Sequence, residues 1–169
     1  SGSAIVRNCL IDNNKSSDIA GLSLNGTAAR VENCTFVDNE SGNFKSLLDS
    51  VGGTTDYGAT FTANNNTGNR IINCLFVGAG NMPRAAGVTF TRADDLLAGE
   101  GNTTAAQGFK TVEGWPYQLT SGSTLVNAGT TLTWMTGTTD LRGNPRLFGR
   151  IVDIGCFERQ IGGATLLLR

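Results

Sequence analysis

Three short stretches of the chain carry the same six-residue pattern, and this repeat constrains the fold more than any other feature. The stretches read VRNCLI from residue 6, VENCTF from residue 31 and IINCLF from residue 71. In each, a β-branched apolar residue is followed two positions later by Asn-Cys, and a large apolar residue stands two positions after the cysteine. Regular repetition of a short unit is typical of solenoids, in which a single coil cannot bury its inner face alone.

A second motif sets the length of the repeat. The stretches GLSLN (21–25), GATFT (58–62) and GVTFT (87–91) each place alternating apolar or alanine residues after a glycine. The intervals from Cys9 to Gly21 and from Cys74 to Gly87 are nearly equal, whereas the interval from Cys34 to Gly58 is much longer. The spacing predicts coils of roughly 25 residues, each with two short strands, and an insertion at about 41–53 in one turn.

Alternation along each strand identifies the side chains expected inside the coils, because residues two apart share a face. The expected inward pairs are Cys9 with Ile11, Cys34 with Phe36, Cys74 with Phe76, Leu22 with Leu24, Ala59 with Phe61, and Val88 with Phe90. An asparagine precedes each cysteine of the repeat, where the chain must bend. We expect these asparagines in the left-handed conformation, with their amides bonding the coils above and below.

Composition supports an all-β chain and excludes several kinds of site. Glycine accounts for 23 of the 169 residues and proline for only 3, so turns are frequent and helix formers scarce. No histidine is present, which removes the commonest general base and metal ligand. The 13 basic and 14 acidic residues balance, so nucleic acid and anionic membranes are not indicated as partners. No apolar run approaches the roughly 18 residues of a membrane span, and no signal peptide is recognisable.

Three cysteines in register raise the alternative of a metal or redox site. Cys9, Cys34 and Cys74 are too widely spaced in the chain to match a CxxC metal motif. Free cysteine is among the most buried residue types and packs as a small apolar side chain. Adjacent coils lie about 4.8 Å apart, less than the usual Cα separation in a disulfide. We therefore expect buried free thiols, with no metal and no cofactor.

The C-terminal part carries a different motif, TDLRGNPRLFGRIVDIGCFE, at residues 139–158. This segment resembles the closing signature of bacterial secreted right-handed parallel β-helix proteins with a choice-of-anchor Q type C-terminal domain. The matching residues are Asp140, Gly143, Asn144, Pro145, Arg146, Asp153, Ile154, Gly155 and Glu158. The upstream YQLTSGSTLVNAGT is similar to a second family segment, although Asn127 stands where aspartate is usual and Thr124 where proline is usual. Cys156 replaces a common alanine.

The resemblance and the repeat together predict one domain. Residues 1–107 would form the coils of a right-handed parallel β-helix, and residues 108–169 its C-terminal cap. In the cap, RGNP reads as a turn in which glycine and asparagine can take positive φ. RIVDIGCFE reads as a last strand across the end of the solenoid. Arg146 has Asp140, Asp153 and Glu158 as candidate partners, and a bidentate contact would hold the cap in place. The alternative is that these acids are catalytic or bind calcium.

Other side chains have alternative readings. Asp94-Asp95 has the composition of a paired-carboxylate site for glycoside chemistry, but neighbours on an extended chain point in opposite directions, which favours a solvated turn. Trp115, Tyr117 and Trp134 are candidates for glycan contact, or they pack the cap. The terminal GGATLLLR (162–169) is too short to span a bilayer but long enough to add as a strand to another chain.

Three functions remain open at this point. The first is a non-enzymatic extracellular or cell-surface module of a larger bacterial protein, acting as scaffold, adhesin or assembly unit, with neighbouring subunits or glycans as partners. The second is a fragment of a polysaccharide lyase or glycosidase. Lys110 and Arg92 are candidate bases for a lyase, although nothing in the sequence places them together. The third is a subunit that stacks end to end into a filament through an open first coil.

Overall fold

The computed structural model describes residues 4–16, 20–24, 28–41, 59–61, 70–78, 87–94 and 98–160. Its regular elements are short strands and one 3₁₀ turn, η2 (Thr133–Met135), with no α-helix in these ranges, so the all-β prediction is confirmed. Nowhere in this part of the chain is there a helix with the length and apolarity to cross a membrane. The predicted insertion at 41–53 lies outside the described residues apart from Ser41, as does the 162–169 tail.

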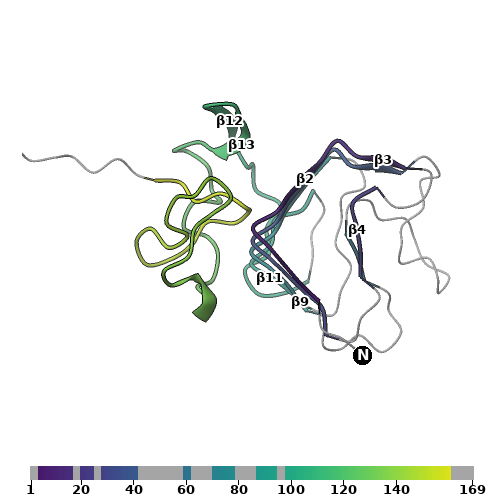
Figure 1. Ribbon diagram of the computed structural model, residues 1–169, viewed down its shortest axis with the longest axis horizontal. Helices are drawn as coiled ribbons and strands as arrows, with labels where there is room; N and C mark the ends of the chain where they lie inside the picture. Colours follow the sequence, from purple (N-terminus) through teal and green to yellow (C-terminus); the bar gives the residue numbers. More distant parts are fainter. Residues whose placement is uncertain are drawn as a thin grey trace, which may run out of the picture.

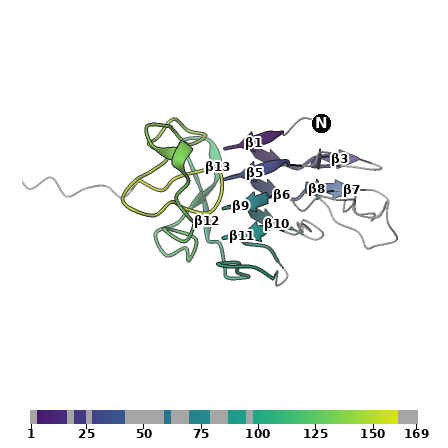
Figure 2. The same cartoon turned by 90° about the horizontal axis from the view of Figure 1, so that it is seen from below.

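Most strands stack in parallel, in register, into four small sheets (Figures 1 and 2). The first sheet contains β1 (Ile5–Arg7), β5 (Arg30–Glu32), β9 (Arg70–Ile72) and β11 (Val88–Thr89). The second contains β2 (Leu10–Asp12), β6 (Thr35–Val37) and β10 (Leu75–Val77). Two pairs complete the stack: β3 (Lys15–Ser16) with β7 (Glu40–Ser41), and β4 (Leu22–Leu24) with β8 (Ala59–Phe61).

The register aligns the three Asn-Cys frames as the repeat predicts. Val6 lies opposite Val31, and Val31 opposite Ile71. Ile11 lies opposite Phe36, and Phe36 opposite Phe76, so like residues form rows along the stack. The rings of Phe36 and Phe76 are fully buried and stacked, with centroids 4.6 Å apart and planes 1° from parallel. These rows form the main core, to which Cys34 and Cys74 also belong.

The asparagine corners adopt the predicted conformation. Asn8, Asn33 and Asn73 have φ values of 50°, 51° and 56°, in the left-handed region between the first and second sheets. Asn73 Nδ2 donates to Asn33 Oδ1 at 3.2 Å, so part of the expected amide ladder forms. The side-chain amides of all three asparagines also donate to the C-terminal segment, as described below.

The prediction for GVTFT (87–91) is confirmed for Val88, which belongs to the main core, but it is wrong for Phe90 and for the sheet that the segment joins. The motifs at 21–25 and 58–62 do pair with each other, Leu22 opposite Ala59. Val88, however, lies opposite Ile71, so β11 is a fourth rung of the first sheet. Phe90 takes the corner position of the asparagines, with φ 49°, and is not among the residues of the main core. The reason is the length of chain between paired residues. Fewer residues separate Ile71 from Val88 than separate the earlier partners in this sheet, too few to form a strand in each of the four sheets.

The stack continues past residue 91, the last residue of the GVTFT motif, as expected for coils over residues 1–107. Thr91 replaces the repeated cysteine: it is fully buried, and Cys74 N donates to its Oγ1 at 3.3 Å. Isolated bridges join Leu75 to Arg92 and Arg92 to Thr103. The Arg92 side chain donates to the carbonyls of Phe76 and Ala105, so it links strand β10 to the chain that follows the stack.

Thiol labelling tests the cysteine row. All four cysteines are free; Cys34, Cys74 and Cys156 are buried and Cys9 is partly exposed. Hydrogen bonding to the neighbouring thiol raises the pKa of Cys9 and of Cys34, and burial raises the pKa of Cys156 to about 12. Because the thiolate is the reactive form, we expect slow labelling at neutral pH, with Cys9 the fastest. Mass spectrometry of labelled peptides measures this. A denatured sample should label all four at once, whereas rapid native labelling of Cys34 and Cys74 would contradict the register.

The C-terminal segment packs beside the stack and not across its end, which corrects the expected cap geometry. It begins with an antiparallel hairpin of β12 (Phe109–Val112) and β13 (Trp115–Leu119), and residues 120–160 contain no further strand. In Figures 1 and 2 it lies along the corner between the first two sheets. Asn8, Asn33 and Asn73 donate their side-chain amides to the carbonyls of Thr139, Asp153 and Thr130 respectively. The left-handed corners turn these amides outward, and the carbonyls of the C-terminal segment accept one hydrogen bond from each of the three successive corners.

Close contact at this corner requires glycine. Gly155 has φ 107°, and its N–H donates to Asn73 O at 2.8 Å. A Cβ at this position would lie 2.9 Å from Thr35 Oγ1, closer than a side chain tolerates. The following residue, Cys156, donates its N–H to the same hydroxyl. A second small core of Leu75, Leu119, Leu125 and Ile154 forms where the segment and the stack meet.

Candidate functional site

The motif residues 140–158 come together around buried charged groups. Asp140, Arg146, Asp153 and Glu158 are 5%, 0%, 1% and 2% exposed. Charged side chains are seldom buried unless they are paired or hydrogen-bonded. The contacts of each group therefore decide whether the cluster is a structural element or a site.

Asp140 organises the RGNP turn. Its Oδ1 accepts the main-chain N–H groups of Arg142 and Asn144, at 2.9 and 2.8 Å. Its Oδ2 accepts the N–H of Glu158 at 2.8 Å, which ties the turn to the end of the motif. Gly143 takes the positive φ expected of it, 85°, whereas Asn144 does not have a positive φ. The carboxylate is occupied by main-chain donors, as in a structural turn.

Arg146 is held mainly by main-chain carbonyls. Its Nη2 donates to the carbonyls of Asp153 and Gly155, at 3.0 and 2.9 Å. The same nitrogen lies 3.7 Å from Glu158 Oε2, a long ion pair. A partner among the three acids is thus confirmed as Glu158, but the predicted bidentate contact is not formed. Burial lowers the pKa of Arg146, and the charge of Glu158 opposes that effect.

Asp153 and Glu158 link different parts of the C-terminal segment through main-chain hydrogen bonds. Asp153 accepts the main-chain N–H groups of Asn127 and Arg159, both at 2.7 Å, and Glu158 Oε2 accepts the N–H of Asp153 at 3.0 Å. Burial raises the pKa of Asp153, and burial together with the charge of Asp153 raises the pKa of Glu158 to about 8. Desolvation disfavours the charged form of a carboxyl group, which is the physical cause of both shifts.

These shifts predict that the protein loses stability as pH rises. The folded pKa of Glu158, about 8, exceeds its ordinary value of 4.5, so the folded state binds more protons across that window. The free energy of unfolding should then fall, by roughly 2–4 kcal/mol, between about pH 5 and about pH 9. Urea unfolding at several pH values measures the slope. Glu158→Gln should flatten it, whereas Glu113→Gln, which removes an exposed carboxylate, should leave it unchanged. An equal slope in the Glu158 variant would contradict the assignment.

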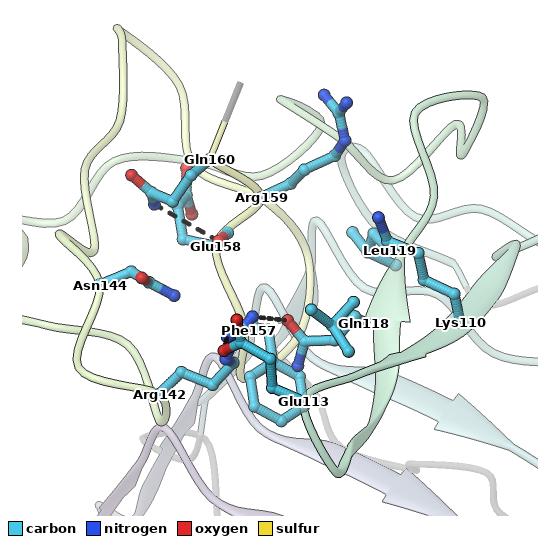
Figure 3. Close-up of a pocket in the computed structure, with 11 residues that line it drawn as sticks. Lys110, Glu113, Gln118, Leu119, Arg142, Asn144, Phe157, Glu158, Arg159 and Gln160 are labelled. Carbon is cyan, nitrogen blue, oxygen red and sulfur yellow. Dashed lines mark hydrogen bonds and ion pairs between the residues drawn. The ribbon is translucent and has the colours of Figure 1, made fainter. Parts of the chain in front are cut away.

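A polar cleft of about 320 Å³ opens between the hairpin and the end of the motif (Figure 3). Arg142 lies in it, ion-paired with the exposed Glu113 at 2.5 Å and 3.5 Å from Gln118 Oε1. Lys110 and Arg159 line the same cleft. Glu158 also lines the cleft, with a side chain that is only 1% exposed. The cleft therefore offers one exposed cation, Lys110, and two partly buried arginines, while its buried acid is engaged in the segment's own hydrogen bonds.

The three aromatic residues predicted as glycan contacts do not form one platform. Trp115 is 39% exposed and packs edge-on against Phe157, with ring centroids 6.0 Å apart. Tyr117 packs edge-on against Phe109, and its hydroxyl accepts from Asn13 Nδ2 at 3.3 Å. Trp134 lies under Arg7, whose guanidinium carbon is 4.5 Å from the ring centroid. Trp115 and Tyr117 thus belong to the hairpin, and Trp134 to a separate groove.

That groove, of about 410 Å³, runs between the outer face of the first sheet and residues 131–134. Arg7, Arg30 and Arg70 line it together with Trp134. Sequence reasoning missed the arginines, although a signal was present: Arg30 and Arg70 stand at the same position, directly before the β-branched residue of the second and third frames.

Of the two acids considered for a paired-carboxylate site, only Asp94 lies in the described part of the chain. Asp94 forms an ion pair with Arg92 at 2.5 Å and accepts the N–H of Gly78 at 2.8 Å; Asp95 lies outside the described residues. Within the described ranges, no group of three or more Cys, Asp and Glu side chains is arranged to hold a metal ion.

Comparison with known proteins adds no relative: no family model, curated protein or solved structure matches the chain.

Proposed function

We propose that the chain is a right-handed parallel β-helix module of a secreted or surface-exposed bacterial protein, and that it acts as a scaffold or adhesin and not as an enzyme. The observation that carries the proposal is the in-register parallel stack. Three sheets repeat with one common offset along the chain, since Ile5 pairs with Arg30, Leu10 with Thr35 and Lys15 with Glu40. Rows of like residues along such a stack are the organisation expected of a solenoid.

The buried acids support a non-enzymatic role. A general acid or base must come within hydrogen-bond reach of its substrate. Asp140, Asp153 and Glu158 are almost completely buried and accept main-chain N–H groups, so they favour a structural function. The motif that they belong to also carries the resemblance to choice-of-anchor Q type domains, which we retain as the proposed family.

Assay on polysaccharides tests the proposal against the lyase and glycosidase alternative. The purified chain should release no reducing ends and no unsaturated products from neutral or acidic polysaccharides. Cleavage that disappears in Lys110→Gln, with folding unchanged by circular dichroism, would replace the scaffold proposal with an enzyme. Secretion of the full-length protein, followed by surface proteolysis, tests the extracellular location.

One observation favours self-assembly as a second role. β1, β2, β3 and β4 lie at the edges of their sheets, and Val6, Cys9, Ile11 and Leu22 are only partly buried there. Their counterparts one rung on, Val31, Cys34 and Phe36, are fully buried. An edge of this kind can pair with another chain. Chromatography and electron microscopy at increasing concentration would reveal filaments, and Val6→Lys should prevent them.

A further inference from the structure

The two ends of the stack differ in how their main-chain groups are satisfied. Figure 2 shows β1 at one end of the stack and β11 at the other. At the β11 end, Asn102 Nδ2 donates to the carbonyl of Val88 at 2.9 Å, and the N–H of Phe90 donates to the carbonyl of Glu100 at 2.8 Å. Gly99 lies so close to the Val88 carbonyl that no side chain would fit between them. The chain thus closes this end of the first sheet with its own hydrogen bonds.

The β1 end is open in the described part of the chain, where no strand other than β5 pairs with β1. The hydrogen bonds to β5 use the carbonyl of Ala4 and the N–H of Asn8. Main-chain groups of successive residues point to alternate sides of a strand, so those of Ile5 and Arg7 point away from β5. The Arg7 carbonyl accepts the Cys9 thiol at 3.1 Å, but a thiol is a weak donor and a carbonyl can accept twice. β1 therefore presents two N–H and two carbonyl groups to a further strand.

The side chains of this edge favour β1 as the strand that accepts a partner. Ile5 is 51% exposed on the outer face, and Val6 is only partly buried against the core. The charge of Arg7 is already paired with Glu32 at 2.6 Å. β3 instead carries Lys15, which is 78% exposed and of a residue type that protects edge strands from pairing. β1 is thus an apolar edge with unpaired main-chain groups.

A second copy of β1 fits this edge in the antiparallel direction. With the two Val6 residues opposite each other, Ile5 of each copy lies opposite Arg7 of the other. The outward main-chain groups of Ile5 and Arg7 then exchange two hydrogen bonds at each of the two places where these residues meet. The apolar stem of Arg7 covers Ile5, and no like charges lie opposite each other. The closed end of a second copy offers no comparable strand.

We propose that two copies of the chain associate through β1, antiparallel and two-fold about Val6, so that their first sheets join into one. The proposal rests on the self-assembly role given above and specifies its surface and its extent. Because the other end of the stack is closed, association stops at two chains. Each copy remains a complete module, so the scaffold role does not depend on the pairing.

Sedimentation velocity over a wide range of protein concentration tests the proposal. We expect a reversible equilibrium between monomer and dimer, with no larger species. Filaments would support self-assembly but would overturn the pairing proposed here, since they require a second open end. Monomers at every concentration would overturn the pairing and the self-assembly role together, while a lack of polysaccharide cleavage would still support the scaffold.

A charge at the exposed Ile5 position separates association from folding. Ile5→Lys places a lysine opposite Arg7 of the other copy at both contacts, so the dimer dissociation constant should rise by about tenfold or more. Circular dichroism should be unchanged, because the side chain is half-exposed. The matched control is Ile151→Lys, which replaces an isoleucine that is 45% exposed on the C-terminal segment and should dimerise as the wild type does. Equal dissociation constants for the two variants would overturn the assignment to β1.

A disulfide trap tests the antiparallel register. Val6→Cys places two thiols opposite each other in a non-hydrogen-bonded pair, in which the Cα atoms lie about 4.5 Å apart, a separation that a disulfide spans. Mild oxidation should link this variant into covalent dimers. Ile5→Cys should not be linked, because each new cysteine lies opposite Arg7 and not opposite its counterpart. The wild type reports any linkage through Cys9. Linkage of Ile5→Cys, or none of Val6→Cys, would overturn the proposed register.

Discussion

Replacing Arg146 with alanine should lower the free energy of unfolding by about 3–5 kcal/mol at about pH 9, where Glu158 is ionised, because it leaves this carboxylate buried without a counter-charge. It also removes two hydrogen bonds to the carbonyls of Asp153 and Gly155, the residues that dock the segment on the stack. Urea unfolding of the variant and the wild type measures the difference.

The loss should itself depend on pH. Glu158 has a pKa of about 8 in the folded protein and can take up a proton when Arg146 is absent. Arg146→Met, which keeps the volume, should therefore be less destabilised at about pH 6 than at about pH 9. Arg142→Met is the matched control. Its ion pair is with Glu113, which is 78% exposed, and exposed pairs contribute at most about 1 kcal/mol. Equal losses of unfolding free energy in the two methionine variants would show that the buried ion pair stabilises the protein no more than the exposed one.

Phe76→Ala should cost about 3–5 kcal/mol, since it leaves a cavity at the centre of the stacked core. The ring is fully buried and packs face to face on Phe36, so neighbouring rungs cannot collapse into the space without losing register. Phe36→Ala should cost a similar amount, and the double variant less than the sum, because the two rings contact each other.

The exposed Ile5 supplies the control for the core variants. Its side chain is 51% exposed on the outer face of β1, and Ile5→Ala should change stability by no more than about 0.5 kcal/mol. A cost below about 1 kcal/mol for Phe76→Ala would mean that the rungs rearrange around the cavity.

The repeat could be predicted from the sequence because its physics is local. Alternation assigns Cys34 and Phe36 to the interior, and asparagine is, after glycine, a residue that tolerates the left-handed corner well. Rows of like side chains then follow, because successive coils with the same residue pattern stack in register. The fourth rung could not be predicted in this way, since GVTFT alternates just as GLSLN does. Phe90 has no local preference for φ near 50°; it adopts the corner because the short return from Ile71 to Val88 places it there.

The position of the C-terminal segment relative to the stack also could not be predicted from the sequence. The motif at 139–158 indicated a structural unit, and the buried contacts of Asp140 and Arg146 agree with that. Whether it covers the end or the side of the stack depends on the outward amides of Asn33 and Asn73, whose partners are distant in the chain. The pairing of Arg30 with Arg70, by contrast, could have been predicted, because both stand directly before the β-branched residue of their frames and like positions stack.

The register offsets have a consequence for how such a chain changes over evolution. The interval between partners lengthens from Lys15 and Glu40 to Leu22 and Ala59, and again to Arg30 and Arg70. The additional residues thus lie in the connections between strands, while the strands themselves stay aligned. Insertions or deletions of any size should be accepted between consecutive strands. A single residue added within β5 would instead turn Val31 to the outer face and a charged neighbour into the core. Lineages of this protein should therefore differ in length by whole segments at the corners and hardly at all within the rungs.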